Sequence, residues 1–169
     1  MNNIGAMALS DDDRMPQAEM HSMPGHLIRR MHQASQAIFD GEMSRTGFDL
    51  TPVQYAALAA IAERPGLDQA SLASAIVFDR ATTGGVIDRL EGKGYVRREI
   101  DRADRRARRL FLEPAGEEAL AQVTPTVRQV QALTLQGLSD AECATLLALL
   151  GKALAAVGDV SRQSARERG

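Results

Sequence analysis

The basic residues of this 169-residue chain are concentrated in one short stretch. Residues 80–109 hold ten of the twenty lysines and arginines against five acids, a formal charge of +5, although the whole chain carries −2. An electropositive segment on an acidic body is typical of a surface that binds nucleic acid, because neutralisation of phosphates supplies much of the affinity. A solvated charged face without a ligand is the alternative interpretation of charge alone. The ten residues are Arg80, Arg89, Lys93, Arg97, Arg98, Arg102, Arg105, Arg106, Arg108 and Arg109.

The residue types give little support for a reactive thiol, a metal site or a phosphate-binding loop. The one cysteine, Cys143, lies on the apolar side of a predicted helix with no basic neighbour, which is typical of a buried structural thiol. His21, His26 and His32 lack the i,i+4 spacing of a helical metal pair. The pair of glycines at 84–85 lacks the Gly-Lys-Ser/Thr ending of a phosphate loop. We therefore predict no enzymatic activity, no metal site and no cofactor.

Two short helices joined by a tight turn lead into the basic segment. Asp68 is the predicted N-cap of a helix through about residue 76, and Asp79 is the predicted N-cap of a second helix that ends at residue 91 or 92. The turn between them is at residues 77–78. The inward side of the second helix consists of Thr83, Val86, Ile87 and Leu90. This arrangement is a helix-turn-helix.

A β-hairpin is predicted directly after the second helix. Residues 95–100 alternate, which places Val96, Arg98 and Ile100 on one side, and residues 108–112 can return as the antiparallel partner. The turn between the strands is polar and basic. A helix-turn-helix followed by such a hairpin is a winged helix, in which the helix enters the major groove and the arginine-bearing tip reaches the adjacent minor groove. We expect a winged helix-turn-helix DNA-binding domain over residues 49–113.

An amphipathic helix is predicted before this domain, and a second helix is predicted at its start. Apolar residues recur at helical spacing from His26 to about Arg45. The next helix has Thr51 as its N-cap, Pro52 at its first position and Gln54 as the capping-box partner.

The C-terminal third contains two helices that a small winged helix does not need for its own core. The first is expected to bend near Pro125, and the second opens with Ser139 and its capping-box partner Glu142. Residues 24–48 and 114–158 are therefore predicted to form a helical dimerisation region. Packing of these helices within one chain is the alternative. The apolar side of the last helix consists of Cys143, Leu146, Leu147, Leu150, Leu154 and Val157.

The two ends of the chain carry no sustained periodicity. Residues 1–23 are expected to be a disordered N-terminal tail, and residues 159–169 a flexible C-terminal tail. No run of 18 apolar residues is present, and an acidic cluster at residues 11–13 stands where a signal peptide would be basic and then apolar. We expect a cytoplasmic protein that does not associate with membranes.

Three motifs resemble the MarR family of ligand-responsive bacterial transcription regulators. They are "LTPVQYAALAAI" at 50–61, "DRLEGKGYVRR" at 88–98 and "DRADRRARRLFLEPAG" at 101–116, within a likeness of order and spacing over roughly residues 26–157. The chain departs from the family pattern at Gly85, Arg102 and Glu113, where arginine, proline and threonine are frequent. The resemblance implies a mainly α fold with a small β-hairpin wing, composed of a winged helix-turn-helix and a helical dimerisation region. It also implies a dimeric, sequence-specific transcriptional regulator of double-stranded DNA.

The predicted DNA contacts come from the second helix of the helix-turn-helix and from the wing. Asp101 or Asp104 would orient one wing arginine through paired hydrogen bonds. An internal glycine costs a helix about 1 kcal/mol relative to alanine. Gly85 is nevertheless predicted as a contact because a residue without Cβ lets the backbone approach DNA closely, and packing against a neighbouring helix is the alternative. The predicted contacts are Arg80, Thr82, Thr83, Gly85 and Arg89 in the helix and Arg102, Arg105 and Arg106 in the wing.

The resemblance further implies a homodimer with two recognition helices about one DNA turn apart, roughly 34 Å, on a pseudo-palindromic operator. The dimer would be a repressor released by a small aromatic or heteroaromatic carboxylate, such as a hydroxybenzoate or a hydroxynicotinate. Arg30 would bind the carboxylate, His26 and His32 would donate hydrogen bonds, and Tyr55 would face the ring. The alternatives are a solvated Arg30, an interface His32 and a core Tyr55. A winged helix that serves protein association alone is the alternative function.

Overall fold

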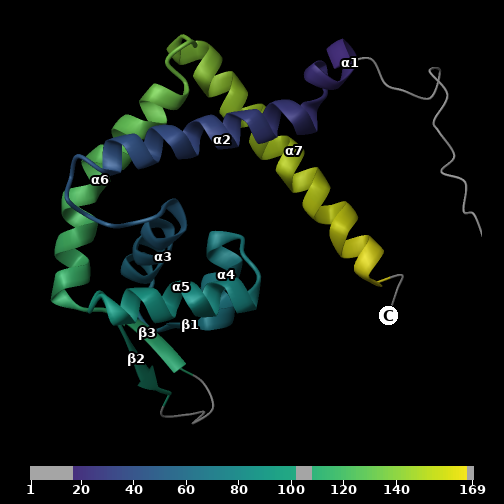
Figure 1. Cartoon of the computed structure of the whole chain (residues 1–169). Coiled ribbons are helices and arrows are strands. Elements are labelled where there is room, and N and C mark those ends of the chain that lie inside the picture. Colours follow the sequence, from purple (N-terminus) through teal and green to yellow (C-terminus); the bar gives the residue numbers. More distant parts are fainter. Residues whose placement is uncertain (1–16, 102–107, 167–169) are drawn as a thin grey trace, which may run out of the picture. The chain divides into compact units, whose positions relative to one another are not determined.

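The computed structural model describes residues 17–101 and 108–166, which form helices α1–α7 and strands β1–β3 (Figure 1). Residues up to Val130 belong to one compact unit and residues from Gln131 onward to a second, so α6 contributes to both. The fold is mainly helical with a small antiparallel sheet, as predicted. Among the described residues, no helix has the length and apolar content needed to span a membrane.

The N-terminal helices begin earlier than the sequence pattern predicts. Residues Gln17–Ser22 form the short helix α1, within the segment 1–23 for which the sequence predicts a disordered tail. Helix α2 covers Pro24–Met43 and starts two residues before the predicted His26. Proline suits the first helical position because the N–H that it lacks would have no partner there. Only Phe39 and Met43, near the end of α2, are buried.

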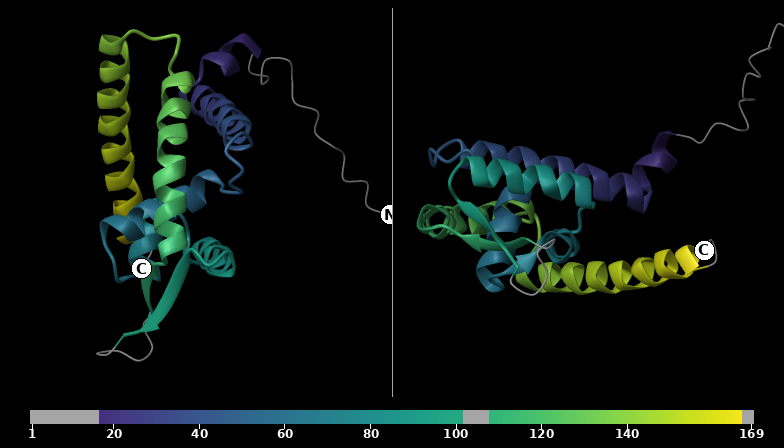
Figure 2. Two further views of the ribbon diagram at one scale, coloured as in Figure 1. Left: turned by 90° about the vertical axis from the view of Figure 1, so that its left-hand side faces the viewer. Right: turned by 90° about the horizontal axis from the view of Figure 1, so that it is seen from below.

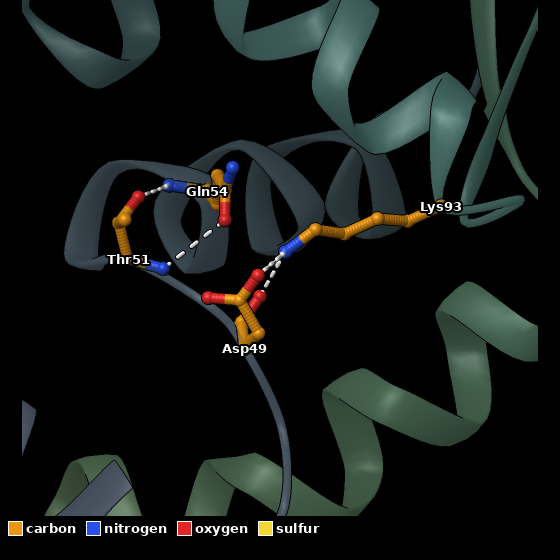
Figure 3. A network of polar contacts seen from close by, with 4 residues as sticks. All are labelled: Asp49, Thr51, Gln54 and Lys93. Carbon is orange, nitrogen blue, oxygen red and sulfur yellow. Dashed lines mark hydrogen bonds and ion pairs between the residues drawn. The ribbon is translucent and has the colours of Figure 1, made fainter. Parts of the chain in front are cut away.

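The three helices of the winged helix begin at the caps that the sequence predicts. Thr51 and Gln54 form a reciprocal capping box, with N···O distances of 3.3 and 3.1 Å (Figure 3). Asp68 and Asp79 each accept a hydrogen bond from the backbone N–H three residues later, at 2.7 and 2.8 Å. These caps satisfy N–H groups that have no partner inside their helices. The helices are α3 (Pro52–Glu63), α4 (Gln69–Ile76) and α5 (Arg80–Gly92).

A three-stranded sheet in the order β1-β3-β2 completes the winged helix (Figure 1). The predicted hairpin is present, with Val96 opposite Leu112 and Ile100 opposite Arg108. Strand β1 was not predicted, because its two residues are too few to show an alternating pattern. It pairs with β3 after a turn at Gly66, whose φ of +83° favours glycine. The strands are β1 (Leu67–Asp68), β2 (Val96–Ile100) and β3 (Arg108–Leu112).

The apolar core of this region draws on every element of the winged helix and on α6. Leucines, isoleucines and valines from the helices and the sheet are fully or almost fully buried. Because one cluster joins all of these elements, the orientation of α5 is fixed by its packing as well as by its cap. The largest buried side chains include Leu58 and Ile61 of α3, Leu72 of α4, Ile87 and Leu90 of α5, Leu110 of β3 and Val123 of α6.

Helix α6 (Pro114–Thr134) leaves the sheet through a tight contact at Gly116. A Cβ at this position would overlap the carbonyl oxygen of Tyr95 and lie 2.9 Å from its carbonyl carbon. Glycine therefore allows α6 to pass directly beside the start of the hairpin. The helix continues through Pro125 without an interruption.

Helix α7 is one long helix, Asp140–Arg166, which Figure 2 shows as an unbroken ribbon. Its start matches the predicted capping box, in which Ser139 N–H donates to Glu142 Oε2 at 2.8 Å and Glu142 N–H donates to Ser139 Oγ at 3.4 Å. The helix extends past the predicted end at residue 158 and continues to Arg166, within the segment predicted as a flexible tail. Cys143 is half-buried, less than the sequence predicts.

Candidate nucleic-acid interface

Helix α5 buries one side and exposes the other. The buried side consists of Thr83, Val86, Ile87 and Leu90, as the sequence pattern predicts. The hydroxyl of Thr83 donates to the backbone oxygen of Asp79 at 2.8 Å, and its side chain has no exposed surface. Because such a side chain cannot touch a base or a phosphate, the structure removes Thr83 from the predicted DNA contacts. Arg80, Thr82 and Arg89 are exposed.

The first turn of α5 is held by the carboxylate of Asp79. It accepts the backbone N–H of Thr82 at 2.8 Å and the Thr82 hydroxyl at 2.5 Å. Both hydrogen bonds favour the ionised carboxylate, and the one from the hydroxyl contributes most to lowering the pKa of Asp79. The carboxylate therefore stays ionised at neutral pH, and the exposed Thr82 side chain has a fixed orientation at the start of the helix.

The two adjacent glycines of α5 have different surroundings. A Cβ on Gly84 would lie 3.1 Å from the side-chain nitrogen of Gln69. That amide nitrogen donates to the backbone oxygen of Arg80 at 3.0 Å and so ties the start of α4 to the first turn of α5. A Cβ on Gly85 would meet nothing within 4 Å. Packing inside the chain therefore accounts for Gly84 and leaves Gly85 without an internal reason.

Gln69 is a residue that the sequence does not single out. Its partner in α5 is eleven positions away, and no spacing rule links two residues across a helix-turn-helix. The hydrophobic pattern places α4 and α5 next to each other, but it cannot indicate which polar side chain spans them.

Ion pairs hold α5 to its neighbours at the far end of the helix. Arg98 of β2 binds Asp88 at 2.5 Å and also binds Glu91, which ties α5 to the wing. Lys93, directly after α5, binds the carboxylate of Asp49 at 2.9 Å and also the backbone oxygen of that residue (Figure 3). The end of α5 is thereby fixed to the wing on one side and to the loop before α3 on the other.

Two arginines of the hairpin are also engaged within the chain. Arg97 binds Glu99 at 2.9 Å and Glu113 at 3.5 Å, and its guanidinium lies 4.9 Å from the centre of the Phe111 ring. The hydrogen bond to Glu99 is the main cause that raises the pKa of Arg97. Arg109 binds Asp101 at 2.6 Å and donates to the backbone oxygen of Gly66 at 3.0 Å.

Asp101 therefore pairs with an arginine at the base of the wing, a partner that the sequence did not suggest. Its predicted role toward the wing tip concerns residues outside those that the structure describes. The predicted contacts Arg102, Arg105 and Arg106 and the predicted orienting residue Asp104 also lie outside the described residues.

Six of the seven described cations of the basic segment fall into two groups. Four of its described cations, at positions 93, 97, 98 and 109, have acidic partners. Arg80 and Arg89 are exposed and form no ion pair within the part of the chain that the structure describes. Their guanidinium groups extend from α5 and are available to phosphates or base edges.

Comparisons with known proteins agree with this arrangement. A model of the MarR family matches residues 50–107. The transcriptional regulator HosA of Escherichia coli is 37% identical over 127 residues, which are 75% of this chain and 91% of HosA. The chain belongs to the MarR family.

Two further MarR-type relatives cover most of the chain. The transcriptional repressor NicR of Pseudomonas putida is 32% identical over 128 residues, 76% of this chain and 80% of NicR. The structure of Bordetella bronchiseptica BpsR, whose DNA binding is regulated by 6-hydroxynicotinic acid, is 31% identical with a TM-score of 0.74. The match covers 78% of this chain and 93% of the BpsR chain. The protein is therefore a MarR-type transcriptional regulator, a class that binds DNA and is not enzymatic.

Three of the predicted effector residues of this MarR protein, His26, Arg30 and His32, lie on α2. Arg30 and His26 lie one helical turn apart on α2, and the His26 ring lies 5.2 Å from that of His21. His32 lies on the opposite side of the helix from Arg30, because two residues turn a helix by about 200°. His26 is half-buried, whereas Arg30 and His32 are exposed.

Tyr55 links α3 of the winged helix to α6. Its hydroxyl lies 3.2 Å from that of Thr124 in α6, and Thr124 donates its own proton to the backbone oxygen of Leu120 at 2.6 Å. Tyr55 is therefore the donor. Its ring packs against the apolar core, which agrees with the alternative reading of Tyr55 as a core residue.

A groove of about 630 Å³ lies between the end of α3, strand β3 and the start of α6. Ile61, Phe111 and Leu120 contribute to its apolar lining, and Arg97 borders it. None of the predicted effector residues lines this groove. Among the described residues, no group of three or more histidine, cysteine or acidic side chains is placed to hold a metal ion.

Proposed function

We propose that this protein is a homodimeric repressor that binds a pseudo-palindromic operator and is released by a small aromatic or heteroaromatic carboxylate. The observation that carries DNA binding is that α5 exposes Arg80 in its first turn and Arg89 in its last, and that neither forms an ion pair within the described residues. Between these arginines in the sequence, Thr82 is held by Asp79 and Asp88 is held by Arg98. A helix that is braced near both ends and exposes an arginine in its first turn and another in its last suits insertion into the major groove.

The DNA contacts proposed for α5 are Arg80, Thr82, Gly85 and Arg89. Gly85 supports close approach, because it is partly exposed and no atom of the described residues lies within 4 Å of the position of its missing Cβ. The wing residues Arg102, Arg105 and Arg106 remain proposed contacts with the minor groove or the backbone.

A homodimer is supported by apolar surface that one chain leaves exposed. Leu27, Ile28 and Met31 in the first half of α2 are each about half exposed. Leu154 of α7 is 71% exposed and belongs to a continuous apolar side of that helix. Burial of apolar surface is the main favourable term in protein association. Single exposed leucines are common on protein surfaces, whereas these helices each expose several apolar residues. The other exposed members of the α7 side are Leu147, Leu150 and Val157.

The effector site is proposed at the N-terminal half of α2, where a second chain would supply the missing walls. Arg30 provides a cation for the carboxylate, and His26 one turn earlier provides a hydrogen-bond donor. The likeness to BpsR, whose DNA binding is regulated by 6-hydroxynicotinic acid, supports this ligand class. The ligand would lower operator affinity by binding the DNA-incompetent state more tightly than the competent one.

The experiment uses a duplex selected by the full-length protein from a random-sequence library. Its affinity is measured by fluorescence anisotropy while 6-hydroxynicotinate or 4-hydroxybenzoate is added. We expect one of these acids to release the DNA from the wild-type protein. In Arg30→Ala we expect DNA binding to persist and release to be lost. Arg29→Ala is the matched control, because its side chain lies about 100° away on the same helix turn.

Three results would contradict the proposal. Absence of any selected duplex would favour the protein-association alternative over DNA binding. Binding without release by either acid would contradict the ligand class. Equal loss of release in the Arg29 and Arg30 variants would contradict the position of the site.

A further inference from the structure

The turn between α4 and α5 holds a backbone conformation that its residue does not favour. Helix α4 ends in a Schellman motif, in which Phe78 N–H donates to Ala73 O at 3.0 Å and Val77 N–H donates to Ser74 O at 3.4 Å. This motif requires a left-handed residue, usually glycine, and here Val77 occupies it with φ 57° and ψ 45°. A β-branched side chain is among the least suited to this region, because its Cβ crowds the neighbouring carbonyl.

Contacts inside the chain do not account for this choice. The Val77 side chain is 88% exposed, so its burial gives nothing to offset the strain. Phe78, the next residue, is 45% exposed although aromatic side chains are usually mostly covered. Together they form an exposed apolar pair directly before the polar residues Asp79 and Arg80. We call this pair the turn patch.

The turn patch adjoins the proposed DNA contacts. Asp79 follows it directly as the N-cap of α5, and Arg80 and Thr82 occupy the first turn of that helix. In helix-turn-helix proteins the N-terminal residues of the second helix contact base edges. The turn that precedes them therefore faces the rim of the same major groove.

We propose that the turn patch contacts thymine methyl groups at the rim of the major groove and contributes to operator specificity. The inference rests on the proposed DNA-binding function. Thymine is the base that offers an apolar group in the major groove, and side chains such as phenylalanine read it through its C5-methyl group. The strained valine is retained because it presents apolar surface where the conformationally suited residue, glycine, has none.

The test separates fold stability from DNA affinity at position 77. Val77→Asn and Val77→Gly relieve the backbone strain, because both residues tolerate the left-handed region, and they remove the apolar surface. We expect both variants to unfold at a higher temperature than wild type and to bind the selected duplex several-fold more weakly. Val77→Ile keeps the apolar surface and should keep the affinity. The asparagine variant controls for the extra flexibility that glycine introduces.

A second measurement identifies the DNA group that is contacted. Single thymines of the selected duplex are replaced by deoxyuridine, which removes only the methyl group. We expect wild-type affinity to fall about four-fold at one or more positions, since a buried methyl-sized group contributes ~0.8 kcal/mol. The same replacements should have no effect on the double variant Val77→Asn, Phe78→Ser.

The outcomes distinguish this inference from the function on which it rests. If wild type binds no duplex, the proposed function fails and the turn patch has no DNA to read. If wild type binds tightly and Val77→Asn binds equally well, the inference alone is overturned, and a protein partner becomes the occupant of the turn patch. Equal sensitivity of wild type and double variant to deoxyuridine would also overturn it.

Discussion

Apolar side chains are buried in the winged helix but are largely exposed on α7 and on the first half of α2. In the winged helix, Leu58, Ile61 and Leu90 have no exposed surface, and one cluster joins three helices and the sheet. On α7, Leu147, Leu154 and Val157 are each more than half exposed, and the first half of α2 exposes Leu27 and Ile28. One region completes its core within a single chain and the other does not.

This difference indicates which properties belong to a single chain and which depend on the proposed dimer. A complete core and braced helix ends orient α5 without help from a partner. Exposed apolar residues on α2, and separately on α7, are available to a second chain, and the proposed effector residues His26 and Arg30 lie in the same half of α2 as Leu27 and Ile28. DNA recognition is thus a property of the folded chain, whereas spacing of the two recognition helices and release by a ligand are properties of the proposed dimer.

The largest expected effect is loss of the winged helix itself. Gly116→Ala would place a Cβ against the backbone of Tyr95. A backbone contact cannot be relieved by a side-chain rotation. We expect a loss of about 3 kcal/mol or more in the free energy of unfolding, measured by urea denaturation. Gly41→Ala in α2 is the matched control, since its Cβ would meet nothing within 4 Å and helix propensity favours alanine. Equal stability of the two variants would contradict the packing argument.

A comparably large effect is expected on association and not on the fold. Leu150→Asp together with Leu154→Asp should weaken dimerisation by about 3 kcal/mol or more, measured by sedimentation equilibrium. Circular dichroism should show that the chain remains helical. Ala148→Asp serves as control, because this residue lies on the opposite side of α7 from Leu150. A dimer that survives the double substitution would remove the proposed interface from this side of α7.

A smaller effect distinguishes the two glycines of α5. Gly85→Leu should fold normally, because its side chain would point into open space, and should bind the selected duplex at least about ten-fold more weakly. Gly84→Ala should gain stability from the higher helix propensity of alanine but should disturb the hydrogen bond that Gln69 donates to Arg80. The substitution should therefore stabilise the wild-type protein by less than it stabilises a Gln69→Ala variant, in which that hydrogen bond is already absent. Thermal unfolding of wild type, Gly84→Ala, Gln69→Ala and the double variant tests the stability prediction, and anisotropy tests the DNA affinity of Gly85→Leu. Retained DNA affinity in Gly85→Leu would contradict close approach.

The smallest effect concerns pH. Because the folded-state pKa of Asp79 lies below the ordinary 3.8, its cap stabilises the protein above about pH 3.8. That contribution disappears as the pH falls through the lowered pKa. Asp79→Asn keeps a capping side chain without a charge and should make stability less dependent on pH in this range. Urea denaturation between pH 2.5 and about 5 measures this, and identical pH profiles would contradict the role of the carboxylate.

Local signals explain why much of the fold could be predicted from the sequence. Thr51, Asp68, Asp79 and Ser139 are N-caps that act within three residues, and the buried side of α5 follows from helical periodicity alone. The same periodicity already placed Thr83 inward, so its inclusion among the DNA contacts conflicted with the pattern. Strand β1 was missed because two residues carry no period.

The candidate site was harder to predict, because it depends on contacts between distant segments. Sequence counts ten basic residues in the segment but does not indicate which of them are paired. Arg98 reaches Asp88 and Glu91 only because the hairpin folds back beside α5. Likewise, Gln69 reaches Arg80 only across the helix-turn-helix. The sequence shows the number of positive charges. It does not show which of them form ion pairs within the chain and which are exposed to a ligand.

The most direct test of that division is the salt dependence of DNA binding. The logarithm of the affinity for the selected duplex is plotted against the logarithm of salt concentration for wild type, Arg80→Ala with Arg89→Ala, and Arg97→Ala. Each lost phosphate contact should reduce the slope by about 1, so the double variant should lose about 4 per dimer if both arginines contact phosphate. Arg97→Ala should leave the slope unchanged, because its guanidinium is paired with Glu99. An unchanged slope in the double variant, or an equal change in Arg97→Ala, would contradict the account.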